Sequence, residues 1–325
     1  MRAELVERVR TGELHPRELV AEALRRIEAD DPAMNAVVGL RAEEALADAE
    51  RVDPTGPLAG LPVLVKDLID VAGMPTTMGS DWLADAPPAT ADGLVVARLR
   101  AAGAIVVGKS NTPAFAHTGF TTNRLFGSTR NPWNRDRSPA GSSGGSAAAL
   151  AAGMVPLATT SDGGGSVRIP ASACGLVGYK PTTGAIGRDV KPAWPSLSTL
   201  GATATSVADV TVEASVILGG TPGDPMSIPQ GRSTSSPVGP AGSSPPPPSG
   251  PTSTPTCAER STPPVPRSRR PASRWFSAAA WCRPTPRSPG SRSPAPISPT
   301  LSSLTATAGR RPRTAWRSCW ASARR

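Results

Sequence analysis

The chain has 325 residues and a formal net charge of +10, and its four cysteines show neither metal-ligand spacing nor a disulfide framework. No apolar run approaches the roughly 18 residues of a membrane span, and the charged, amphipathic N-terminus is unlike a signal peptide. A protein that spans a membrane, or whose fold depends on a structural metal ion or on several disulfides, is therefore not expected. The composition predicts a cytoplasmic protein.

Helical spacing of apolar residues marks the first part of the chain. Residues 2–10, 16–30 and 41–51 each place apolar side chains on one stripe and charged ones on the other face. Pro16 suits the first turn of the second helix. We interpret these three helices as packing elements.

Strand and helix patterns then alternate. Short β-branched runs predict buried strands, and amphipathic or small-residue segments predict helices. The expected strands are residues 62–71, 104–108, 155–159 and 176–179, and the expected helices are residues 92–102, 147–153 and 206–218. This alternation favours a layered α/β fold with a mostly parallel sheet.

The composition changes abruptly near residue 220. Residues 1–224 carry 20 basic and 24 acidic residues, whereas residues 225–325 carry 15 arginines, no lysine and one acid, Glu259. The second part also holds 21 of the 38 prolines. We expect residues 1–220 to form an incomplete folded core and residues 221–325 a Pro/Arg/Ser-rich disordered tail. We hypothesise that the tail is translated in the wrong reading frame.

Two glycine-serine clusters stand out, at residues 141–146 and 163–166. Such clusters are often flexible linkers, but apolar segments separate and follow these two. The second cluster places three glycines before Ser166, so that four successive N–H groups share one bend. That geometry is suited to stabilising an oxyanion.

A serine nucleophile needs a base. The chain has two histidines, of which His15 lies at a helix junction and His117 is interpreted as structural or as lining a pocket. Lys66 lies inside an apolar strand, where desolvation would favour the neutral amine. The residues alone support a catalytic Lys66 and a lysine paired with Asp67 at the strand end about equally.

Other polar residues in these segments are given structural interpretations. Lys109 and Lys180 are interpreted as surface or pocket-rim residues, and Tyr179 as a core residue. Ser143 and Ser146 are expected to cap the following helix or to bond backbone groups.

Taken together, these segments resemble the amidase signature family of serine amidohydrolases. Ala140 stands where that family often has a first glycine, and the resemblance spans about residues 5–218. The matching segments are GLPVLVKD (60–67), GKSNTP (108–113), GSSGGSAAALAAG (141–153), TSDGGGSVRIPA (160–171) and CGLVGYKPT (174–182).

The resemblance implies a mixed sheet with helices on both faces, and a catalytic triad. Matched motif by motif, Lys66 is the base, Ser142 the bridging residue after a cis peptide bond, and Ser166 the nucleophile. The backbone N–H groups of the bend would bind the oxyanion, and flanking residues would support it. The oxyanion donors are Gly163, Gly164, Gly165 and Ser166, and the supporting residues are Asp162 and Arg168.

The implied function is hydrolysis of a small-molecule carboxamide or linear amide through an acyl-enzyme, without metal or organic cofactor. With a lysine base, activity is expected to rise towards alkaline pH without the inflection near pH 6–7 of a histidine base. The alternatives are an inactive truncated or frameshifted remnant and the glutaminase subunit of a tRNA-dependent amidotransferase. A homodimer is left open. The tail's arginines and tryptophans show no regular spacing, so a nucleic-acid partner is not expected.

Overall fold

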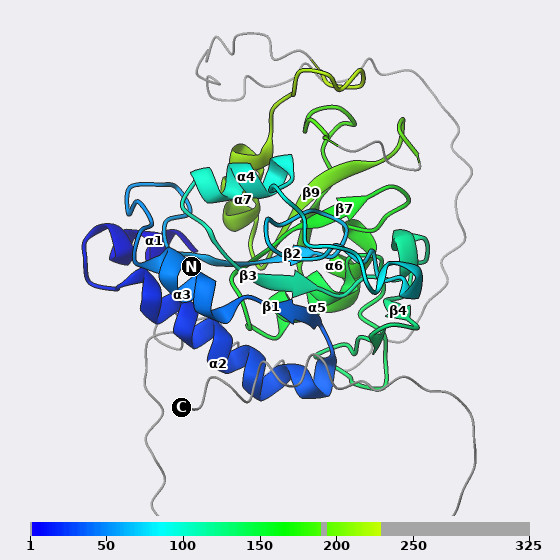
Figure 1. The fold of residues 1–325 in the computed structure, drawn as a ribbon, viewed down its shortest axis with the longest axis horizontal. Coiled ribbons are helices and arrows are strands. Elements are labelled where there is room, and N and C mark those ends of the chain that lie inside the picture. The colour runs from blue at the N-terminus through cyan, green and yellow to red at the C-terminus, as the bar shows by residue number, and fades with distance from the viewer. Residues whose placement is uncertain (1, 190–193, 229–325) are drawn as a thin grey trace, which may run out of the picture. The chain divides into compact units, whose positions relative to one another are not determined.

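A computed structural model describes residues 2–189 and 194–228 of the chain (Figure 1). The family-like part was expected to end at residue 220, but the described chain continues to Ile228, whose N–H donates to the carbonyl of Gly184 at 2.9 Å. The expectation of disorder in the tail falls on residues 229–325, which lie outside the described residues. None of the helices in the described ranges is long and apolar enough to cross a membrane.

The N-terminal part contains three helices, α1 (Arg2–Arg10), α2 (Pro16–Met34) and α3 (Ala42–Ala49). All three were expected, although α2 continues beyond the expected end at residue 30. The side chain of His15 caps its start, with Pro16 in the first turn. Its end is set by Asn35, which adopts a left-handed conformation with φ of 55°.

A four-stranded sheet forms the centre of the fold, in the order β1–β3–β2–β6. Its strands are β1 (Val37–Leu40), β2 (Pro62–Lys66), β3 (Ile105–Ser110) and β6 (Leu157–Ala158). Strand β2 pairs in parallel with β3 and β6, and β1 pairs antiparallel with β3. The central sheet is therefore mixed and mostly parallel, as expected, with β1 as an edge strand that the sequence pattern did not predict.

A second sheet of three antiparallel strands was not expected. It consists of β7 (Thr160–Asp162), β9 (Thr199–Ala204) and β8 (Val177–Tyr179), in that order. Strands β6 and β7 are separated only by Thr159, so one continuous segment leaves the central sheet and enters the second. Two short strands elsewhere pair as a hairpin, β4 (Thr122–Asn123) and β5 (Gly127–Ser128).

Helices cover both sides of the central strands. In Figure 1, α2 and α3 lie on one side of β2 and β3, and α4 (Leu94–Ala101) and α7 (Val207–Ile217) lie on the other. Helix α5 (Gly144–Ala151) contacts β2 and β3, and all eight of its small or apolar residues are buried. The short helix α6 (Arg168–Cys174) follows the second glycine-serine cluster and contacts α5 and β8. Two single-turn 3₁₀ helices lie at Asp81–Leu83 and Ala114–Ala116.

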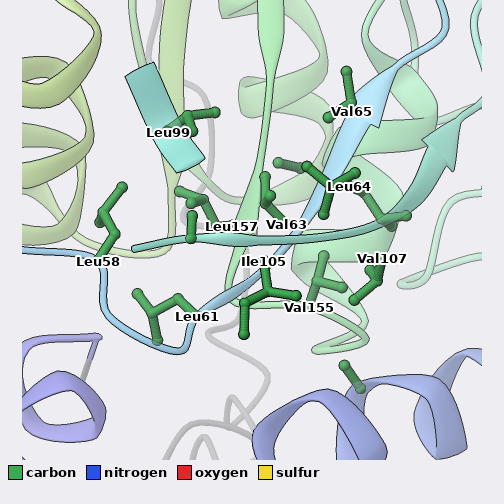
Figure 2. Close-up of a cluster of buried hydrophobic side chains, with 14 of the residues drawn as sticks. Leu58, Leu61, Val63, Leu64, Val65, Leu99, Ile105, Val107, Val155 and Leu157 are labelled. Carbon is green, nitrogen blue, oxygen red and sulfur yellow. The ribbon is translucent and has the colours of Figure 1, made fainter. Parts of the chain in front are cut away.

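The core is built from aliphatic side chains of the central strands and the segments beside them (Figure 2). Burial of this apolar surface is the main force that orders the strands. The side chains labelled in Figure 2 are Leu58, Leu61, Val63, Leu64, Val65, Leu99, Ile105, Val107, Val155 and Leu157, all fully or almost fully buried.

One buried ion pair joins the two ends of the described chain. Arg2 donates to the Glu213 carboxylate at 3.1 Å, and both side chains are almost completely buried. The backbone N–H of Arg2 donates to Asp209 at 3.2 Å, and its guanidinium also reaches the carbonyl of Thr203 at 3.3 Å. Burial raises the pKa of Glu213 to about 7 although Arg2 acts in the opposite direction. These contacts fix α1 against α7 and β9.

Candidate active site

Lys66 is the last residue of β2, and its side chain is completely buried. Its Nζ atom lies 2.8 Å from Ser142 Oγ, 2.9 Å from Ser143 Oγ and 2.9 Å from Ser161 Oγ. The amine is therefore enclosed by three hydroxyl groups, each of which can accept a hydrogen bond or donate one. Ser142 and Ser143 of the first cluster and Ser161 of strand β7 thus meet at a single nitrogen atom.

The position of Lys66 depends on the junction between the two sheets. Its backbone N–H donates to Thr159 Oγ1 at 2.8 Å, and Thr159 is the residue between β6 and β7. Burial lowers the pKa of Lys66 to about 7, and the Asp162 carboxylate acts in the opposite direction. A substantial fraction of the amine is therefore neutral near pH 7.

Lys66 does not pair with Asp67, so that alternative for the lysine is wrong. The Asp67 carboxylate instead accepts from Lys109 Nζ at 3.4 Å and from the hydroxyl of Thr77. Lys109 also donates to the carbonyl of Ile69 at 2.7 Å. The interpretation of Lys109 as a surface or rim residue is wrong as well, because its side chain is 2% exposed and its charge is matched inside the protein.

The first glycine-serine cluster leads into α5. The peptide bond between Gly141 and Ser142 is cis, as the resemblance implied. The hydroxyl of Thr112 donates to the Ser142 carbonyl at 3.1 Å, which holds this residue beside β3. The Ser143 side chain makes no capping bond to α5. It bonds instead to the backbone of Ser161 and to Lys66.

The second cluster is folded around the Asp162 carboxylate. This carboxylate accepts from the backbone N–H of Gly165 at 2.8 Å and of Val167 at 3.1 Å. It also accepts from Arg168 Nε and Nη2, both at 2.9 Å. The carboxylate itself is buried, whereas the Arg168 side chain is largely exposed. These donors keep the pKa of Asp162 below its ordinary value despite the burial. The Asp162 carboxylate therefore fixes the conformation of the bend through its hydrogen bonds with Gly165 and Val167.

Ser166 lies at the end of this bend and is partly buried. Its carbonyl accepts from the N–H of Ser143 at 3.4 Å, so the two clusters are in direct backbone contact. Within the described ranges its Oγ makes no hydrogen bond. The N–H groups of Gly163, Gly164 and Ser166 also have no partner there.

The expected oxyanion donors need one correction. Gly165 was included among them, but its N–H is already donated to Asp162. An N–H that is committed to a buried carboxylate is not available to a reacting oxygen. Three candidates therefore remain, Gly163, Gly164 and Ser166.

Neither histidine reaches this centre. His15 caps α2, far along the chain from the clusters, and its ring lies 3.8 Å from Glu50. His117 is exposed, and its ring contacts that of Trp194 at a tilt of 36°, with ring centroids 5.5 Å apart. Trp194 in turn packs against Gly163, since a Cβ at that glycine would lie 2.9 Å from its ring. His117 therefore lies near the rim of the bend, and its ring contact is with Trp194 and not with a serine or lysine of the centre.

The sequence pattern missed two residues of this centre and placed Tyr179, outside it, incorrectly. Ser161 was given no role, although its position one residue before Asp162 brings it to Lys66. Thr159 was predicted only as the end of a strand. Tyr179 was expected in the core but is 41% exposed, and the expectation for Lys180 fits its partly exposed side chain.

The arrangement offers proton transfer between a buried amine and a buried hydroxyl. A buried amine with a pKa near 7 contacts a buried hydroxyl, and free N–H groups lie on an adjacent bend. Among the described residues there is no group of three His, Cys, Asp or Glu side chains that could hold a metal ion.

The chain is also similar to known proteins in sequence and in fold. The chain matches the amidase family over residues 18–241. A glutamyl-tRNA(Gln) amidotransferase subunit of Synechococcus sp. (strain CC9605) is 44% identical over 226 residues, which are 67% of this chain and 46% of that protein. An acylamidase of Rhodococcus erythropolis is 40% identical over 233 residues, 69% of this chain and 49% of that protein. The solved structure of a 6-aminohexanoate cyclic dimer hydrolase with its substrate superposes with a TM-score of 0.68 at 37% identity, covering 71% of this chain and 49% of that one.

The chain spans about half the length of the relatives that it matches. The family match continues past residue 220, where the sequence pattern had placed the end of the family-like part. It covers both glycine-serine clusters, Lys66 and every strand of the two sheets. The chain therefore belongs to the amidase family, among the amidase signature enzymes.

Proposed function

We propose that this chain hydrolyses the C–N bond of a small-molecule amide through an acyl-enzyme on Ser166. Lys66 is the base in this proposal, and Ser142 relays the proton between them. The observation that carries the proposal is the 2.8 Å contact between Lys66 Nζ and Ser142 Oγ inside the core. A buried lysine with a pKa of about 7 is matched to accepting a proton at neutral pH.

The proposed reaction conserves protons within the triad. Ser166 Oγ bonds to the amide carbon while its proton passes to Ser142, and the proton of Ser142 passes to Lys66. The tetrahedral intermediate collapses with cleavage of the C–N bond, and the leaving amine takes a proton back along the same path. Water then attacks the ester in the same way, which releases the carboxylic acid and restores Ser166.

The bend supplies the proposed oxyanion site. The unpaired N–H groups of Gly163, Gly164 and Ser166 are the donors, and the Asp162 carboxylate holds the bend through Gly165 and Val167. Pre-oriented donors stabilise the negative oxygen of the intermediate because they need no reorganisation when the charge develops. Asp162 and Arg168 are therefore proposed as supports and not as reacting groups.

The names of the relatives support amide chemistry in general. One is an acylamidase, one a hydrolase of 6-aminohexanoate cyclic dimer, and one belongs to an amidotransferase. As a glutaminase, the chain would cleave the same type of bond with glutamine as the amide. The experiment therefore uses a probe that reads the nucleophile directly and needs no knowledge of the substrate.

The test is labelling of the full 325-residue chain with an alkyl fluorophosphonate, in which Ser166 Oγ bonds to phosphorus as fluoride leaves. We expect mass spectrometry to place the label on Ser166, and Ser166→Ala to abolish it. Lys66→Met and Ser142→Ala should slow labelling by about 10²–10⁴-fold. The control Ser172→Ala removes an exposed serine of α6 and should change nothing.

Two outcomes would contradict the proposal. Undiminished labelling of the Ser166→Ala variant would show that another residue is the nucleophile. A folded but unreactive parent chain, with native circular dichroism, would instead support the alternative of an inactive remnant.

A further inference from the structure

Three hydroxyl groups contact Lys66 Nζ, but the proposed relay uses only one of them. Ser142 is the relay, Ser143 follows it in the same cluster, and Ser161 approaches from β7. A neutral amine has two N–H donors and one lone pair, whereas the ammonium has three donors. The three hydroxyls therefore match either protonation state, provided that each takes a defined role.

The role of Ser143 is fixed by its other hydrogen bonds. Its hydroxyl donates to the carbonyl of Ser161 at 3.2 Å and accepts from the N–H of Ser161 at 3.2 Å. A hydroxyl has one proton and two lone pairs. The single proton of the Ser143 hydroxyl is donated to the Ser161 carbonyl, so Ser143 Oγ can only accept a hydrogen bond from Lys66. One N–H of the neutral amine is thereby assigned to Ser143.

Burial separates the roles of the other two hydroxyls. Ser142 is 1% exposed, and within the described part of the chain Lys66 Nζ is the one partner of its Oγ. A buried O–H without another acceptor must donate to the lone pair of the amine or remain unsatisfied. Ser161 is only partly buried, so its proton can point to water while its oxygen accepts from Lys66.

We propose that Ser161 is a positioning residue that accepts the second N–H of Lys66 and so directs the lone pair of the amine at Ser142. This inference rests on the proposed function. Without Ser161, the second N–H turns to Ser142 Oγ, and the lone pair then points away from the proton it must receive. Ser161 acts through Lys66 and does not touch the reacting atoms.

The proposal also predicts how the charge of Lys66 responds. In the ammonium state of Lys66, the third N–H donates to Ser142 Oγ, and Ser161 Oγ still accepts one of the other two. Removing the Ser161 hydroxyl therefore takes one acceptor away from the charged amine and destabilises the charged form. Asp162, the residue after Ser161, is the carboxylate whose charge favours that form, and the variant leaves it in place. The Asp67 carboxylate faces Lys109 instead. Loss of Ser161 should therefore shift the titration of Lys66 towards lower pH.

The experiment measures the rate of fluorophosphonate labelling of the full-length chain between about pH 5 and 10, a range that brackets the titration of the base. For Ser161→Ala we expect a loss of about 10- to 100-fold at the alkaline plateau, the size of a hydrogen bond to a group that becomes charged, because the Lys66 amine gains its charge as it accepts the proton. The midpoint of the pH dependence should fall by about one pH unit. Ser161→Thr keeps the hydroxyl and should restore both quantities. Ser161→Cys, with a weaker acceptor, should shift the midpoint in the same direction by less.

The matched control is Thr160→Val, which removes the neighbouring hydroxyl. Thr160 bonds to the carbonyl of Gly201 and to Thr203, and makes no contact with Lys66. It should lower stability but leave the midpoint unmoved. An unchanged midpoint in Ser161→Ala, while Ser166→Ala still abolishes labelling, would overturn this inference and leave the proposed function standing. Persistent labelling of Ser166→Ala would overturn both.

Discussion

The amine of Lys66 is held by neutral hydroxyl groups, although two buried carboxylates belong to segments that adjoin it. Asp67 is bound to Lys109, and Asp162 is bound to Arg168 and to backbone N–H groups. Desolvation of the ammonium is therefore only partly offset, which is why burial dominates its pKa. This has consequences for stability as well as for reactivity.

The first prediction concerns stability and pH. The pKa of Lys66 falls from 10.5 in the unfolded chain to about 7 in the folded one. Between these values the unfolded state binds more protons, so the contribution of Lys66 to stability rises with pH, by up to about 1.4 kcal/mol per pH unit. Lys66→Met lacks this dependence. The difference in free energy of unfolding between parent and variant, measured by urea unfolding, should therefore change steadily in favour of the parent from about pH 7 to pH 9.5.

The control for that measurement is Lys180→Met. Lys180 is partly exposed and bonds only to the carbonyl of Pro181 at 2.6 Å within the described ranges. Its removal should leave the pH dependence of the parent unchanged. A constant difference between parent and Lys66→Met across this pH range would show that Lys66 keeps an ordinary pKa.

The second prediction concerns reactivity and pH. Because the base must be neutral, the labelling rate should fall about tenfold for each pH unit below 7. Burial moves the pKa of the lysine into the range where histidine titrates, so an inflection near pH 7 replaces the earlier expectation of a profile without one. The position of the inflection does not distinguish the two bases, but His117→Phe does. We expect an unchanged profile, and loss of the inflection in this variant would make His117 the base.

Single residues were predictable where a motif fixes the chemistry and not where a side chain's partner comes from a distant strand. The resemblance named Lys66, Ser142 and Ser166 from the local sequence. Ser161 escaped notice because its contact with Lys66 exists only where β7 crosses to the second sheet. Pairing of Lys66 with Asp67 does not occur because β2 ends at Lys66 and the chain turns there, which brings the Asp67 carboxylate to Lys109.

At the scale of elements, the first turn of α5 controls how the two clusters meet. A Cβ at Gly145 would overlap the backbone N and O of Asn111 and lie 2.8 Å from the carbonyl of Ala36. The helix therefore approaches β3 and the residue before β1 more closely than any other residue type would permit. The serines at the start of α5 are positioned by this contact.

The third prediction follows from that close approach. Helix propensity alone would make Gly145→Ala stabilising by about 1 kcal/mol. The overlap with backbone outweighs this, so we expect a net loss of about 1–3 kcal/mol, measured by thermal unfolding. Gly119→Ala is the control, because a Cβ there meets nothing within 4 Å, and should change stability by less than about 0.5 kcal/mol. If Gly145→Ala left the free energy of unfolding unchanged, α5 would be able to move away from β3 without cost.

Elements with a periodic apolar stripe or a clear apolar run were predicted well, and so was the short strand β8, but other short strands were not. All three N-terminal helices, β3 and α7 lie close to their expected bounds because each buries a periodic apolar stripe or run. The strand expected at residues 62–71 ends at Lys66, since the chain turns there to bring Asp67 to Lys109. Strands β1, β7 and β9 carry no clean alternation, and pairing with other strands orders them more than their own sequence does.

At the scale of the whole molecule, several large apolar side chains of the described residues face outward. Trp82 is 85% exposed, Val207 69% and Phe120 65%. The relatives are about twice as long as the matched part of this chain. We infer that these side chains belong to surfaces that further family sequence would cover.

The fourth prediction concerns the gene. Charge and composition switch near residue 220, after which acids give way to arginine and proline, as expected when GC-rich coding sequence is read out of frame. One alternative frame after the Leu218 codon should then encode alternating strand and helix patterns with lysines and acids restored. Sequencing of the gene checks this, and the hypothesis fails if neither frame does so.

The same hypothesis predicts the behaviour of the product. Without the covering sequence, the 325-residue chain should aggregate and turn over amides slowly, even where Ser166 still reacts with a fluorophosphonate. A chain expressed from the restored frame should unfold cooperatively and turn over faster. A soluble, cooperatively unfolding and fully active protein with the present sequence would show that the altered segment does not matter.

The contacts of Arg2 with Asp209 and Glu213 also determine when α1 can dock while the chain is being synthesised. The ribosome makes Arg2 at the start and Glu213 211 residues later, so α1 cannot take its final place until α7 has emerged. Until then the apolar side of α1, with Leu5, Val6 and Val9, has no completed core to enter. The first helix to be made is thus among the last to dock, and a nascent chain that stalls before Glu213 leaves it available to chaperones.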